Sequence, residues 1–116
     1  MEQYLGQKVE VIVDRPLGST HPKHNNIVYP INYGFVQGII AGDGEEQDAY
    51  ILGADIPLER FVGRVIAIIK RKTDNEDKWV VAPEGKFYSV SEIEAFVNFQ
   101  EQYFEHDIVI SGESND

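Results

Sequence analysis

Residues 29–53 read YPINYGFVQGIIAGDGEEQDAYILG, and this stretch decides the fold. Two strand-like runs, at 32–40 and 48–53, flank the glycine-containing segment AGDGEEQ. Apolar, β-branched and aromatic runs on either side of a glycine turn are typical of a β-hairpin. The turn contains Asp43 and Glu45, and Asp48 begins the second run. The predicted hairpin therefore concentrates negative charge at its bend.

Further strands are predicted on both sides of this hairpin. KVEVIV at 8–13 alternates between apolar and polar residues, and VGRVIAIIKRK at 62–72 has a continuous apolar centre that predicts burial on both faces. After the polar turn TDNED, KWVVAP at 78–83 is the second limb of another hairpin. Residues 14–26 contain two prolines and a glycine and predict an irregular loop.

One helix is expected near the end of the chain. Ser89 and Glu92 have the spacing of a capping box, and apolar residues recur on one face after them. We expect a helix at about residues 90–105, followed by a frayed, acidic end, SGESND.

Five strands and one late helix predict a mainly β (α+β) fold. The expected architecture is a small, five-stranded, OB-like closed β-barrel, with the C-terminal helix over one opening or side. A length of 116 residues suits a single domain spanning 1–116, because a second core would not fit.

Composition and charge limit the classes of partner and the cellular compartment that we expect. The net charge of −10, from 20 acidic and 10 basic residues, repels nucleic acid and anionic membranes, so we expect neither as a partner. There is no cysteine for disulfides or thiolate metal sites. No charged-then-apolar leader begins the chain, and VIAII is too short to cross a bilayer. These features predict a soluble, cytoplasmic protein.

The acidic turn has two interpretations. Asp43 and Glu45 project to one face in extended backbone, and Asp48 can point into the same concavity, where a hard cation such as Mg²⁺ would compensate their repulsion. A simple solvated hairpin tip is the alternative. The second turn, with Asp74, Glu76 and Asp77, strengthens the first interpretation, because two acidic turns at one end of a barrel could hold a pair of divalent ions suited to phosphoryl transfer.

Several residues near these turns are suited to contacting phosphate. The hydroxyls of Tyr29 and Tyr33 can donate hydrogen bonds to phosphate oxygens, although packing is the commoner role for tyrosine. His21 and Lys23 in the HPKH segment, and Lys78 after the second turn, offer positive charge. Surface lysines are more often only solvated, so each of these residues by itself leaves both interpretations open.

The quoted stretch resembles the central motif of the soluble family I inorganic pyrophosphatases. Their equivalent reads approximately Tyr-Pro-x-Asn-Tyr-Gly, followed by Asp-Gly-Asp-Pro-x-Asp. The resemblance continues through TDNEDKWVVAP and QYFEH and covers roughly residues 8–107. It implies a small barrel fold, Mg²⁺-dependent hydrolysis of pyrophosphate (with Mn²⁺ as an alternative ion) and, because such enzymes form dimers or hexamers, a homo-oligomer.

The resemblance also implies roles for particular residues. Asp43, Asp48 and Asp77 match Mg²⁺ ligands, and Asp74 matches a ligand of a metal that arrives with substrate. Glu45 stands at the position of the general base. Tyr33 and Lys78 match contacts to phosphate and metal-bound water, and Tyr29 has a supporting role. His21 stands where the family has an arginine that grips phosphate, and Lys23 is nearby.

This chain departs from the family at several of these positions. Glu45 replaces an aspartate, Asn75 replaces a carboxylate, and Asp107-Ile108 replaces a Tyr-Lys pair. Asp14 is an approximate match for a first-strand glutamate, and a hairpin bearing a lysine and another glutamate is missing. Two hypotheses follow: a pyrophosphate or related phosphoanhydride hydrolase, and a non-catalytic module that binds metal or a phosphorylated ligand.

Overall fold

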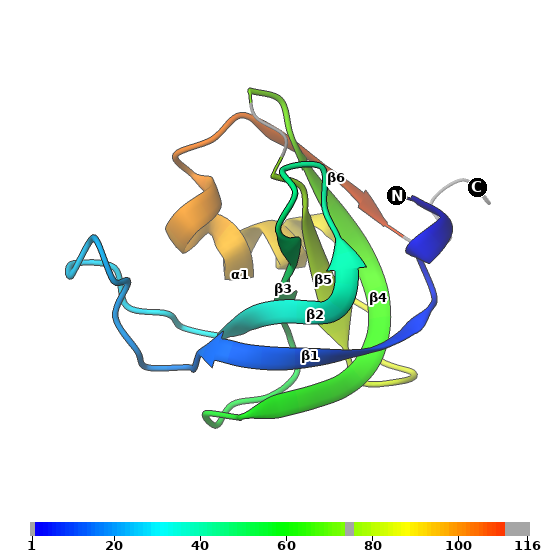
Figure 1. Cartoon of the computed structure of the whole chain (residues 1–116), viewed down its shortest axis with the longest axis horizontal. Helices are drawn as coiled ribbons and strands as arrows, with labels where there is room; N and C mark the ends of the chain where they lie inside the picture. Colours follow the sequence, from blue (N-terminus) through cyan, green and yellow to red (C-terminus); the bar gives the residue numbers. More distant parts are fainter. Residues whose placement is uncertain (1, 74–75, 111–116) are drawn as a thin grey trace.

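The hairpin of residues 29–53 forms as predicted in the computed structural model, which describes residues 2–73 and 76–110. Strands β2 (Asn32–Ile40) and β3 (Glu46–Ile51) pair antiparallel. With β1 (Lys8–Arg15), β4 (Arg60–Arg71) and β5 (Lys78–Ala82) they make a sheet in the order β1-β2-β3-β5-β4. Pairing of β1 with β4 closes the sheet into a five-stranded barrel (Figure 1), which confirms the predicted fold class.

Three features differ from the prediction. A sixth strand, β6 (His106–Ile110), pairs antiparallel with the second half of β4, and a short 3₁₀ helix, η1 (Glu2–Tyr4), precedes β1. Helix α1 spans Val90–Glu101, so it begins where predicted but ends short of residue 105. A tight turn follows α1, in which the Phe104 N–H donates to the Glu101 carbonyl at 2.9 Å, and the β-branched residues after it suit a strand.

The apolar core has two layers. The inner layer receives side chains from all five barrel strands, including Val11, Val36 and Trp79, and therefore fills the barrel. The outer layer lies between the barrel wall and α1, which contributes Ile93 and Val97. Residues 65–69 of β4 are all buried and divide between the two layers, so the predicted burial of both faces of this strand is confirmed.

Two local features of the sequence fix the start of the helix and the close approach of two barrel strands. The predicted capping box forms at the start of α1, with the Glu92 N–H donating to Ser89 Oγ at 3.1 Å and the Ser89 N–H donating to Glu92 Oε1 at 2.8 Å. In the barrel, a Cβ atom at Gly34 would lie 1.9 Å from the Ile12 carbonyl oxygen, so only glycine lets β1 and β2 approach this closely.

Among the described residues, no helix is both long enough and apolar enough to cross a membrane.

Candidate functional site

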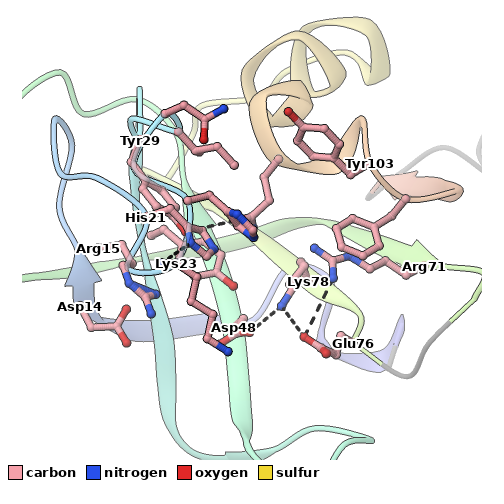
Figure 2. A pocket seen from close by; sticks show the side chains of 16 residues that line it. Asp14, Arg15, His21, Lys23, Tyr29, Asp48, Arg71, Glu76, Lys78 and Tyr103 are labelled. Atoms are coloured by element: carbon pink, nitrogen blue, oxygen red, sulfur yellow. Dashed lines mark hydrogen bonds and ion pairs between the residues drawn. The ribbon is translucent and has the colours of Figure 1, made fainter.

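A pocket of about 740 Å³ lies on the outer side of the barrel, beside the C-terminal end of α1 (Figure 2). Three parts of the chain line it: the barrel strands, the segment 16–31 between β1 and β2, and the residues around the end of α1. Its volume is within the range of roughly 300–1,000 Å³ that is usual for small-molecule sites.

The segment 16–31 is more ordered than the predicted irregular loop. Thr20 and Val28 form an isolated antiparallel bridge, and the His21 N–H donates to the Ile27 carbonyl at 2.9 Å. Buried Asn32 fastens the base of this small hairpin, because its Oδ1 accepts from the Leu17 N–H at 2.9 Å and from the Leu58 N–H at 3.0 Å. These bonds hold His21 and Lys23 at the pocket.

Asp48, Lys78 and Glu76 form a charged group on the barrel side of the pocket (Figure 2). Lys78 Nζ donates to Asp48 Oδ2 at 2.6 Å and to Glu76 Oε1 at 3.3 Å. The Lys78 side chain is only 4% exposed, whereas those of Asp48 and Glu76 are 34% and 44% exposed. The buried ammonium is therefore compensated by two carboxylates that also reach solvent in the pocket.

Arg71 approaches the same group from the end of β4. Its guanidinium makes a bidentate ion pair with buried Glu101 of α1, with Nε–Oε1 and Nη2–Oε2 distances of 3.0 and 2.7 Å. Its Cζ lies 3.7 Å from the centre of the Phe104 ring, and its Nη1 lies 3.9 Å from Glu76 Oε1. Arg71 thus has a fixed orientation in the pocket wall.

The pocket is less acidic than the chain as a whole. Four cationic side chains line it, against three carboxylates, so the lining carries a formal charge of +1 when its histidines are neutral. The pocket is still neutral when Glu101 behind the wall is counted, in a chain of net charge −10. Among the described residues, the side chains of Arg15 and Lys23 have no ion-pair partner, which leaves both for an anionic ligand.

The ionisable side chains of the lining respond to burial and to these charges. Burial, followed by the charge of Asp48 and a hydrogen bond with it, holds the pKa of Tyr33 well above its usual value, so this phenol stays protonated as a donor. Burial, with the nearby cations and His24, lowers the pKa of His21. Burial also raises the pKa of Asp14; the charge of Arg15 opposes this effect, and the charge of Asp48 adds to it.

The structure brings some of the predicted site residues together and not others. Those that line the pocket are His21, Lys23, Tyr29, Tyr33, Asp48 and Lys78. Asp43 and Glu45 do not line it. They lie exposed in the turn after β2, where Asp43 Oδ1 accepts from the Glu45 N–H at 3.0 Å and stabilises the bend instead.

The second acidic turn contributes unequally to the pocket. Glu76 lines it, but Asp77 does not, and the Asp77 carbonyl accepts from Gln47 Nε2 at 2.7 Å. The prediction for Asp74 lies outside the described residues. One carboxylate from each acidic region, Asp48 and Glu76, therefore meets at Lys78.

The described residues do not fit a resident metal centre. No group of three or more His, Cys, Asp or Glu side chains in this part of the chain could hold an ion, and the Asp48 carboxylate is engaged by Lys78. The ligand set that the resemblance implied includes Asp74, which lies outside the described residues, so it stays a prediction.

Sequence reasoning gave no pocket role to several of the lining residues, namely Arg15, Gln100, Tyr103 and Phe104. Arg15 ends β1, and strand ends often carry functional groups, but its contact with the pocket depends on the return of segment 16–31. Gln100, Tyr103 and Phe104 line the pocket because they lie around the end of α1 at Glu101. The sequence predicted that the helix would end later, at about residue 105.

Comparisons with known proteins show the fold. No family model matches this chain, and no curated protein matches it. The inorganic pyrophosphatase of Ehrlichia chaffeensis superposes with a TM-score of 0.70 at 18% identity, over 91% of this chain and 87% of that one. The enzyme of Neisseria gonorrhoeae gives 0.65 at 22% identity, over 84% and 74%, and that of Coxiella burnetii gives 0.64 at 18%, over 91% and 86%. The chain therefore has the inorganic pyrophosphatase fold, as its sequence resemblance implied.

Proposed function

We propose that this chain binds pyrophosphate, or a closely related phosphoanhydride, in the pocket beside α1 and hydrolyses it to two phosphates. The observation that carries the proposal is the convergence of Arg15 and Lys23, which form no salt bridge with another described residue, on a pocket that also contains Lys78. Three cations within one pocket suit the oxygens of a diphosphate. The shared fold supports the same conclusion.

The pocket residues supply the parts that the reaction needs. Arg15, Lys23 and Lys78 hold the phosphoryl oxygens and neutralise charge on the leaving phosphate. In this proposal Asp48 orients the attacking water and accepts its proton. The water oxygen bonds to one phosphorus, and the bridging P–O bond breaks. The bridging oxygen leaves with the second phosphate.

Mg²⁺, with Mn²⁺ as the alternative, belongs to this proposal as an ion bound to the anionic substrate. Such an ion would shield phosphate charge from the carboxylates of the pocket. Because the described residues hold no assembled ligand set, no step of the reaction is assigned to the metal.

Phosphate release from pyrophosphate, with and without Mg²⁺, tests this proposal. We expect turnover with Mg²⁺ and a loss of about 100-fold or more in Asp48→Asn, the usual range for removing a general base. Asp55→Asn, an exposed acid outside the pocket lining, is the matched control and should retain activity. Undiminished activity in Asp48→Asn would exclude the pocket as the active site.

A second candidate, binding without hydrolysis, is favoured by one observation. The salt bridge between Asp48 and Lys78 occupies the carboxylate that hydrolysis requires. This alternative predicts that pyrophosphate raises the melting temperature while no phosphate is released. A thermal-shift titration beside the release assay separates the two, because turnover eliminates the binding-only function.

A further inference from the structure

The pocket is large for pyrophosphate, and its aromatic side chains differ in whether they pack against other side chains. Most aromatic rings in its lining already have partners. His21 stacks on Tyr29 with ring centres 6.3 Å apart, Tyr33 packs edge-on against Tyr50 at 4.9 Å, and Phe104 lies under Arg71. These rings are part of the wall.

Tyr103 is the exception among the described residues. It lines the pocket with 63% of its surface exposed and has no ring or cation partner in the described chain. In Figure 2 it lies beside the end of α1, apart from Asp48, Lys78 and Glu76. An exposed aromatic face of this kind can stack on a planar ring of a ligand.

From these features, and on the basis of the proposed function, we infer that the phosphoanhydride this pocket prefers is a nucleoside diphosphate, which it binds more tightly than free pyrophosphate. Its two phosphoryl groups lie at Lys78, Arg15 and Lys23, and its base stacks on Tyr103. A volume of about 740 Å³ accommodates such a ligand, whereas pyrophosphate alone leaves much of it to water.

Hydrolysis of this substrate needs no other reactant. Water adds its oxygen to the terminal phosphorus and the P–O–P bridge breaks. The bridging oxygen takes a proton or stays anionic on the nucleoside monophosphate, and orthophosphate is released. Gln100 at the same end of the lining is engaged within the wall, because its Nε2 donates to the Tyr50 hydroxyl at 2.7 Å and its Oε1 accepts from the Tyr29 hydroxyl at 3.1 Å.

Two non-hydrolysable ligands with the same P–C–P group, of which only the first carries a nucleoside, test the inference by calorimetry: α,β-methylene-ADP and methylenediphosphonate, both with Mg²⁺. We expect α,β-methylene-ADP to bind at least about fivefold tighter, the lower end of the effect of one base–aromatic stack. Tyr103→Ala should remove this increment without changing the Kd of methylenediphosphonate. Tyr103→Phe, which keeps the ring, should retain it.

The possible outcomes separate this inference from the proposed function. If methylenediphosphonate binds and the nucleoside adds nothing, or if Tyr103→Ala weakens both ligands equally, the nucleotide inference is overturned and the proposed function stands. If neither ligand binds, the proposed function fails, and the inference fails with it.

Discussion

The ion pair between Arg71, at the end of β4, and Glu101, at the end of α1, connects the barrel to the helix. The side chains are 4% and 0% exposed, and the Tyr50 hydroxyl donates a further hydrogen bond of 2.7 Å to Glu101. Buried charges are tolerated only when they are paired, so each partner depends on the other. The pair also fixes the Arg71 guanidinium at the pocket wall.

Removing one of these charges should destabilise the fold strongly. We expect Glu101→Gln to lower the free energy of unfolding by about 3 kcal/mol or more, because it leaves the Arg71 guanidinium buried without its main carboxylate partner. Urea denaturation measures this loss. Glu10→Gln breaks an ion pair with Arg60 whose side chains are 68% and 45% exposed, and should cost no more than about 1 kcal/mol. Equal effects of the two substitutions would contradict the role given to burial.

At the residue level, the predicted basic and aromatic site residues all line the pocket, whereas of the predicted acids in the described chain only Asp48 does. Six of the predicted site residues line the pocket, although their roles stay predictions. The turn acids were harder to place because spacing alone does not determine where a carboxylate points. Asp43 accepts a hydrogen bond within its own turn, and the sequence did not distinguish this local use from ligand binding.

Among the elements, α1 and β6 are linked by a histidine. His106 Nδ1 lies 2.7 Å from the Phe104 carbonyl, and its Nε2 lies 2.8 Å from Glu94 Oε1. Both acceptors are satisfied at once only by the doubly protonated imidazolium. Burial lowers the pKa of His106, but these two hydrogen bonds and the charge of Glu94 outweigh it, so the pKa is raised.

The raised pKa of His106 predicts how stability depends on pH. Because the folded state binds this proton more tightly than the unfolded state, the stabilisation is complete below the unfolded pKa of about 6.5 and is lost as pH rises through the folded pKa. We expect Glu94→Gln to cost about 1 kcal/mol at acidic pH and much less near pH 9. Urea denaturation of both proteins across this range measures the difference. A cost that is independent of pH would show that the imidazolium is not involved.

The two ends of α1 show what an element's own sequence can predict. Its start depends on Ser89 and Glu92, which lie within one turn of each other, and the local signal was sufficient. Its end depends on partners distant in the chain. Phe104 packs under Arg71, and β6 pairs with β4 from Arg71–His106 to Ala67–Ile110, so the residues after the helix are held by the barrel.

For the whole molecule, closure of the barrel depends on pairings that periodicity does not encode. The sequence predicted both antiparallel hairpins, but not the parallel pairing of β3 with β5 or the sharing of one edge of β4 between β1 and β6. The pocket arises from this topology, because it brings the end of β1, segment 16–31 and the end of α1 together. Local patterns could therefore predict the fold class while missing pocket residues such as Arg15 and Tyr103.

The net charge of the whole molecule predicts that this OB-like barrel does not bind single-stranded nucleic acid. Barrels that do so combine stacking aromatics with a continuous basic groove, and a net charge of −10 opposes a phosphate chain even though the pocket is locally neutral. A labelled oligonucleotide of about 12 nucleotides should show no change in fluorescence anisotropy at an ionic strength of about 0.15 M. Methylenediphosphonate binding by the same preparation is the positive control. Saturable oligonucleotide binding that weakens with added salt would mean that local charge, rather than the net charge of the molecule, selects its ligands.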